Sequence, residues 1–109
     1  MKLKDIIEKL NLECINAARL DDDINSAYAS DLLSDVMGNA SEGQIWITVQ
    51  THKNVMAIAS LKDMPAVILV KGSVPDPDML EQAQNEDICL LVTKDETFEI
   101  CGKLYELIK

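Results

Sequence analysis

A chain of 109 residues with 48% hydrophobic and 27% charged residues has the composition of one globular domain with a single core, not that of a disordered chain. Nineteen Asp and Glu residues against ten Lys and Arg residues give a formal net charge of -9. Because nucleic-acid binders gain most of their affinity from clustered Lys and Arg, this balance disfavours a nucleic-acid partner.

The first part of the chain predicts a short helix followed by two extended segments. Apolar residues from Leu3 to Leu10 recur at the spacing of one helical face. Extended segments are expected at residues 12–17 and 24–29, on either side of a polar turn.

A second helix is expected to begin after Ser30 or Asp31, because either side chain can accept a hydrogen bond from the free amides of a helix start. Gly38-Asn39 is a stop signal for this helix. Its predicted buried side consists of Leu32, Leu33, Val36 and Met37.

The central stretch, residues 44–60, combines a strand, a polar turn and a helix. Residues 45–49 are apolar, rich in β-branched side chains and contain the only Trp, whereas residues 53–62 follow helical spacing. Between them lies the turn Gln50-Thr51-His52. Groups just past the carboxyl end of a strand face a crevice in open α/β sheets, so the only His lies where a ligand site is expected.

The second half of the chain continues this alternation. Residues 66–70 are continuously apolar, as in a parallel strand covered on both faces. Asp76 as cap and Pro77 as first helical residue predict a helix to about Asn85, and residues 88–92 predict another buried strand. Strands alternating with helices favour right-handed crossovers. The predicted fold is therefore a single three-layer α/β domain over residues 1–109, with a mainly parallel sheet of about four to five strands flanked by helices.

The last helix is predicted over residues 95–108, with Thr93 and Glu96 as a capping box. Its apolar residues form two adjacent stripes: Phe98, Cys101, Tyr105 and Ile108 in one, Ile100, Leu104 and Leu107 in the other. Two interpretations are open. The stripes form one broad core face, or one of them is reserved for a partner subunit.

The cysteines and the N-terminus both indicate a cytoplasmic protein without membrane contact. Cys14, Cys89 and Cys101 are far apart and odd in number, which favours neither a disulfide framework nor a zinc site. The N-terminus enters an amphipathic pattern without the apolar core of a signal peptide, and no apolar run is long enough to span a bilayer.

The sequence offers little for catalysis. His52 has the only side chain whose ordinary pKa lies near neutrality, but no nucleophile motif accompanies it. No glycine-rich phosphate loop is present, and Asp21-Asp22-Asp23 lacks the spacing and the glycine of a calcium loop. No catalytic residue, metal ligand or cofactor is predicted, and the chain is not expected to be an enzyme.

Two segments carry a resemblance to a known family. Residues 28–37, YASDLLSDVM, and residues 43–52, GQIWITVQTH, are similar to the DRTGG domain family, and the resemblance extends over nearly the whole chain. The motif that names the family would fall just before Tyr28. Here an acid stands near the expected Arg, and Ser26-Ala27 replaces the glycine pair.

The resemblance implies a regulatory domain. Such domains are similar to the N-terminal domain of HPr kinase/phosphorylase and also occur beside CBS pairs, and they often self-associate. Stand-alone members occur in anaerobes near hydrogenase genes, which implies a protein partner in anaerobic redox metabolism. The kinase activity belongs to a separate P-loop domain and is not implied for this chain.

These observations predict a non-catalytic regulatory or ligand-sensing module that binds a nucleotide or other anionic metabolite and acts as a homodimer. The alternative is a structural docking partner of a larger enzyme, such as a hydrogenase or its maturation machinery. The site is expected in a crevice between Ser30-Asp31 and Thr51-His52, at a helix N-terminus that favours anions. The predicted ligand-binding residues are Tyr28, Ser30, Asp31, Thr48, Gln50, Thr51, His52 and Asn54.

Overall fold

Helices and strands alternate along most of the chain in the computed structural model, which describes residues 1–109. The elements are α1 (Leu3–Lys9), β1 (Glu13–Asn16), β2 (Ala27–Ala29), α2 (Leu33–Asn39), β3 (Ile45–Thr48), α3 (Lys53–Leu61), β4 (Ala66–Leu69), α4 (Pro77–Glu86), β5 (Cys89–Val92) and α5 (Thr97–Ile108). None of these helices has the length and the apolar run that crossing a membrane requires.

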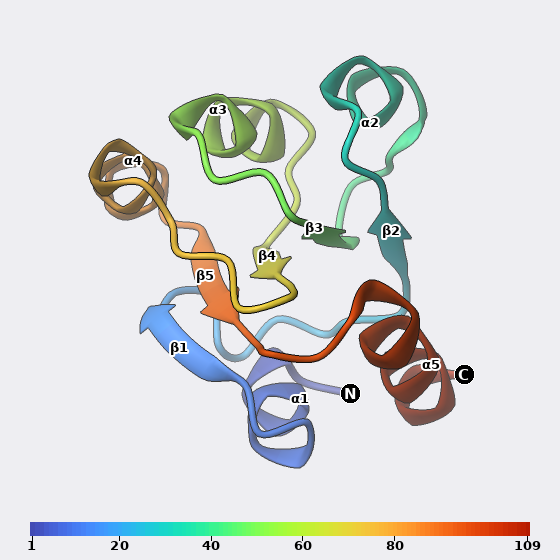
Figure 1. Cartoon of the computed structure of the whole chain (residues 1–109). Coiled ribbons are helices and arrows are strands. Elements are labelled where there is room, and N and C mark those ends of the chain that lie inside the picture. Colours follow the sequence, from blue (N-terminus) through green and yellow to red (C-terminus); the bar gives the residue numbers. More distant parts are fainter.

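The strands form one sheet in the order β1-β5-β4-β3-β2. Strands β2 to β5 are parallel, and β1 pairs antiparallel with β5 at one edge. From β2 to β5 each connection moves one strand in the same direction, so right-handed crossovers place α2, α3 and α4 on one face. Figure 1 shows α1 and α5 on the opposite face. The predicted three-layer fold with a mainly parallel sheet is confirmed.

The core has two halves because the central strands are covered on both faces. Alternate side chains of β3 and β4 point to opposite sides: Trp46 and Val67 pack under α2–α4, while Ile47 and Ile68 pack against α1 and α5. The first half contains 13 buried residues and the second 14. Strands of this kind need apolar residues at every position, which explains their continuous apolar runs.

Strand β2 leaves one edge of the sheet open. The carbonyl of Ser26 and the amide of Ser30 bond to the backbone of β3 at 3.2 Å. Backbone amides and carbonyls alternate in direction along a parallel strand. The amides and carbonyls of Ala27 and Ala29 therefore point away from the sheet. This edge is only three residues long, which limits its capacity to pair with another chain.

Neither residue predicted to cap α2 does so. The N-cap of α2 is Leu32, and the Ser30 hydroxyl accepts from the amide of Leu32, before the helix begins. Asp31 does not cap either, because its carboxylate bonds to the end of β3. The predicted stop at Gly38-Asn39 is confirmed, because the helix ends at Asn39.

The capping box of α5 also lies later than predicted. Glu96 is the N-cap and forms the box with Glu99, so the helix begins at Thr97. The hydroxyl of Thr93 instead accepts from the amide of Asp95 at 3.2 Å. This turn separates β5 from α5 and lets the chain cross to the other face of the sheet.

The structure distinguishes the two apolar stripes of α5. Ile100 and Leu104 are buried in the core. In the other stripe Phe98 is 89% exposed and Tyr105 is 68% exposed. Cys101 and Ile108 of the same stripe are partly buried and pack against the core. The broad-core interpretation therefore holds for Cys101 and Ile108 and is wrong for Phe98 and Tyr105, which form the exposed stripe of α5.

Replacing Leu104 with Ala should lower the free energy of unfolding by about 2–5 kcal/mol, because it removes buried methyl groups and leaves a cavity under α5. Leu61 provides a matched control, since it is 70% exposed at the end of α3 and Leu61→Ala should cost less than about 0.5 kcal/mol. Urea denaturation followed by circular dichroism measures both. Equal losses in the two variants would contradict the assignment of α5 to the core.

Candidate functional site

The carboxyl ends of β2 to β5 meet at one edge of the sheet, and the predicted ligand-binding residues lie at the β2 and β3 half of this edge. Tyr28 belongs to β2, and Ser30-Asp31 lie in the loop that follows it. Thr48 ends β3, and the turn from Gln50 to His52 leads into α3.

Asp31 joins these segments through its carboxylate. Its Oδ1 accepts from the Thr48 hydroxyl and from the amide of Val49, both at 2.9 Å. The Gln50 side chain donates to the Asp31 carbonyl at 3.0 Å. Because the Thr48 side chain is buried, with 1% exposed, these bonds fix the end of β3 to the loop before α2. The structure thus brings Asp31 together with Thr48 and Gln50, and it does so through internal hydrogen bonds.

Tyr28 and Ser30 contribute to a neighbouring network. The Tyr28 hydroxyl donates to the carboxylate of Asp35 at 3.0 Å. Hydrogen bonding from Ser30 and Tyr28 lowers the pKa of Asp35, and the same carboxylate raises the pKa of Tyr28. The Ser30 carbonyl accepts from the Trp46 indole at 2.8 Å. Asp35 is therefore held in its charged form, and Tyr28 as a neutral donor.

The other half of the predicted site faces a different loop. His52 Nδ1 lies 3.1 Å from Asp76 Oδ2, and the Asp76 amide donates to the Thr51 carbonyl at 3.1 Å. These contacts join Thr51 and His52 to the β4–α4 loop, whereas Gln50 of the same turn bonds to Asp31. Asn54 lies exposed in the first turn of α3 and forms no side-chain hydrogen bond.

The groups with acid-base, metal-binding or thiol chemistry are the His52–Asp76 pair, the carboxylates and the cysteines. The His52–Asp76 pair is exposed and has no hydroxyl or thiol within hydrogen-bonding distance. No group of three or more His, Cys, Asp or Glu side chains has the arrangement that holds a metal ion. Burial raises the pKa of Cys89 to about 12 and raises that of Cys101, so both thiols are protonated packing groups.

The sequence did not reveal a cavity of about 530 Å³ at the other half of the carboxyl edge. It is enclosed by the α1–β1 turn, the β4–α4 loop, the β5–α5 loop and the side chain of Lys103. The only signal in the sequence was the Gly-Ser-containing loop after β4. Nothing in the sequence indicated that the α1–β1 turn lies beside it.

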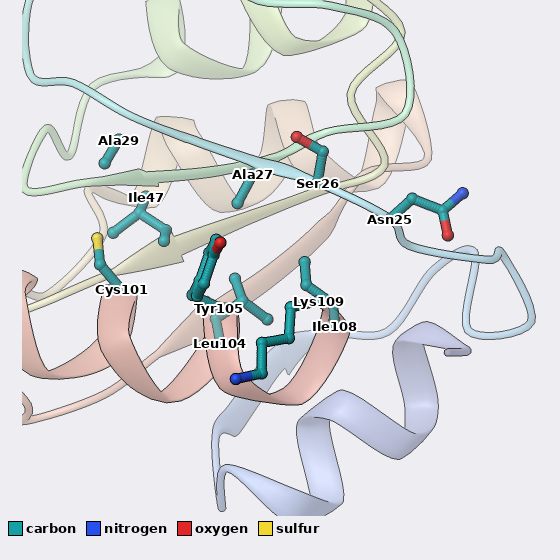
Figure 2. Close-up of a pocket in the computed structure, with 10 residues that line it drawn as sticks. All are labelled: Asn25, Ser26, Ala27, Ala29, Ile47, Cys101, Leu104, Tyr105, Ile108 and Lys109. Atoms are coloured by element: carbon teal, nitrogen blue, oxygen red, sulfur yellow. The ribbon is translucent and has the colours of Figure 1, made fainter.

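A second cavity of about 330 Å³ lies between the edge strand β2 and α5. Figure 2 shows Ala27, Ala29 and Ile47 on the sheet side, facing Leu104 and Tyr105 of the helix. Most of its lining is apolar, and Tyr105 also belongs to the exposed stripe of α5. The cavity and the stripe therefore form one continuous apolar surface.

The sequence matches no protein-family model, and it matches no curated protein. Among solved structures, the fold is similar to the CBS and DRTGG domains of the regulatory region of Clostridium perfringens pyrophosphatase, complexed with the activator diadenosine tetraphosphate. The TM-score is 0.69 at 18% sequence identity, and the match covers 93% of this chain. It covers 44% of the pyrophosphatase chain, so this chain spans less than half of that region. The resemblance establishes a fold related to that of a regulatory region.

Replacing Asp31 with Ala should lower the free energy of unfolding by about 1–3 kcal/mol, because the buried Thr48 hydroxyl and the Val49 amide lose their acceptor. The double variant Asp31→Ala/Thr48→Val should recover part of this loss, since it removes one of the unsatisfied donors. Urea denaturation of the single and double variants gives the coupling energy. Strict additivity would show that the bond between Asp31 and Thr48 contributes nothing.

Proposed function

We propose that this chain is a non-catalytic regulatory module that binds an anionic metabolite or nucleotide at the carboxyl edge of its sheet and acts as a homodimer. The observation that carries the proposal is the edge itself. Loops leading into α2, α3 and α4 are tied together there by the bonds of Asp31 and by the His52–Asp76 pair. A ligand at this edge would contact several helix-bearing loops at once.

The similarity to a regulatory region supports this proposal. The pyrophosphatase region is described as bound to a nucleotide activator, and its structure is similar to this chain over 93% of the chain. A ligand-sensing role needs a binding surface, and it does not need a nucleophile. The isolated His52–Asp76 pair fits that role better than it fits acid-base catalysis, which requires a reacting group within hydrogen-bonding reach.

A docking role is the second candidate, and the exposed stripe of α5 favours it. Phe98 and Tyr105 are large, apolar and mostly exposed, and the cavity beside β2 extends the apolar surface. Exposed patches of this kind mark interaction sites. In the first proposal the same surface joins two copies of the chain; in the second it binds a larger enzyme, such as a hydrogenase or a protein of its maturation.

The sensing role predicts that at least one nucleotide or phosphorylated metabolite raises the melting temperature of the purified chain. Binding to the folded state alone stabilises it by about 2.7 kcal/mol when the ligand is at 100 times its Kd. His52→Ala should remove the shift, because the β4–α4 loop loses its tie to α3. Lys62→Ala, at the opposite edge of the sheet, should retain it. A broad panel without any shift would count against a sensing role.

The dimer predicts a mass near twice 12.1 kDa by light scattering at micromolar concentration. The double variant Phe98→Ser/Tyr105→Ser should be a folded monomer, because it removes the exposed apolar stripe and leaves the buried one intact. A wild-type chain that is monomeric, yet co-purifies with a large partner through this stripe, would favour the docking role. Loss of that partner in the double variant would then identify the surface.

A further inference from the structure

The β4–α4 and β5–α5 connections leave neighbouring strands toward opposite faces of the sheet. Helix α4 lies on the face of α2 and α3, whereas α5 lies on the opposite face (Figure 1). In open α/β sheets, such a reversal opens a crevice outside the carboxyl ends of the two strands, and ligands bind there. The cavity of about 530 Å³ occupies this position.

The base of this crevice is fixed by backbone hydrogen bonds between the two loops. The amide of Lys71 donates to the Asp95 carbonyl at 2.9 Å, and the amide of Gly72 donates to the Thr93 carbonyl at 3.0 Å. Lys71 has a φ of 62° and is one of five non-glycine residues in the left-handed region, so its conformation alone does not mark a site. The two hydrogen bonds join the β4–α4 and β5–α5 loops, and both of these loops line the cavity.

The charges that line the cavity leave one cation and one carboxylate free. Lys103 and Asp95 form an ion pair of 2.8 Å, so they neutralise one another. Lys94 and Glu13 also line the cavity, and neither forms a side-chain hydrogen bond or an ion pair. A polyphosphate would need several free cations. One free Lys fits a ligand with a single anionic group.

The remaining walls offer aliphatic surface for the faces of a flat ring and a hydrogen-bond acceptor for hydroxyl groups. Leu10, Ile15, Val74 and Pro75 provide aliphatic surface, and Val74 is 79% exposed at the rim. The carboxylate of Glu13 only accepts hydrogen bonds, and vicinal hydroxyls are paired donors of the kind that it can bind. The volume lies within the range of small-molecule pockets.

We propose that this cavity binds a ribonucleoside monophosphate, with Lys94 at the phosphate, Glu13 at the ribose hydroxyls and the aliphatic walls around the base. The inference rests on the proposed sensing function, and it specifies where the ligand binds and to which class it belongs. The His52–Asp76 pair then holds one wall of the cavity in place, since Asp76 ends the loop that contains Val74 and Pro75.

The test is a titration of the ¹⁵N-labelled chain with AMP, GMP, CMP and UMP, followed by amide chemical shifts. At least one of the four should shift the amides of residues 71–74 and 93–95 with a saturable Kd. The matching nucleoside, which lacks the phosphate, should bind about tenfold more weakly, the value of one hydrogen bond to a charged group. The 2′-deoxynucleotide should also bind more weakly, because it lacks one donor to Glu13.

Two variants separate the roles of the charged residues. Lys94→Ala should weaken binding of the monophosphate about tenfold and leave the affinity for the nucleoside unchanged. Glu13→Ala should remove the preference for ribose over deoxyribose. Lys62→Ala and Glu42→Ala are matched controls at the opposite edge of the sheet, where neither side chain forms a hydrogen bond or an ion pair, and both should leave binding unchanged.

Each contrary outcome overturns a defined part of the inference. Nucleotide-induced shifts confined to residues 48–54 would overturn the cavity and leave the sensing function in place. Tighter binding of ATP than of AMP, or full affinity in Lys94→Ala, would overturn the assignment of ligand class. The ligand class would also be overturned if another phosphorylated metabolite bound and none of the four monophosphates did. A chain that binds none of these compounds would overturn both proposals.

Discussion

Burial of the central strands on both faces is the constraint on which the rest of this structure depends. Every residue of β3 and β4 is buried, so each face of the sheet needs a cover of helices. The crossovers from β2 to β5 all run in one direction and place α2, α3 and α4 on the same face. The other face can only be covered from the two ends of the chain, by α1 and α5. The chain must therefore cross the sheet after β5, and this crossing creates the crevice beside β4.

The same constraint explains the apolar surface beside β2. Only α1 and α5 cover this face of the sheet (Figure 1). The cavity between β2 and α5 shows that they leave part of it uncovered at its open edge. The side chains exposed there are the small ones of Ala27 and Ala29, and the second cavity lies over them. Tyr105 of the exposed stripe lines this cavity.

Patterns within a short stretch of sequence predicted most of the fold. Apolar runs identified β3, β4 and β5, and Asp76-Pro77 correctly marked the start of α4. The caps of α2 and α5 were wrong because capping residues have competing partners. Asp31 could bond to free helix amides nearby or to the buried Thr48 hydroxyl, and the structure uses the latter. A short stretch of sequence does not reveal that distant partner.

The candidate site was predictable to a similar extent. Polar residues after β3 lie at the carboxyl edge, as the strand–turn–helix pattern predicted, but the partner of His52 is 24 residues away in the β4–α4 loop. The larger cavity depends on three segments that meet only because β1 pairs antiparallel with β5. The left-handed conformation of Lys71 was also unpredictable, since no glycine marks that position.

Helix α5 contributes residues to both cavities. Lys103 lines the larger cavity, whereas Tyr105, two residues later, lines the apolar cavity beside β2. The helix is joined to the first cavity by the Asp95–Lys103 ion pair. It is attached to the core by the buried Ile100 and Leu104 and by the partly buried Cys101, Leu107 and Ile108. A ligand that competed with Asp95 for Lys103 would change the contacts that orient this helix. A ligand shifts an equilibrium between two conformational states only by the difference between its affinities for them. Coupling between a ligand and a partner would therefore depend on the difference in the position of α5 between the two states.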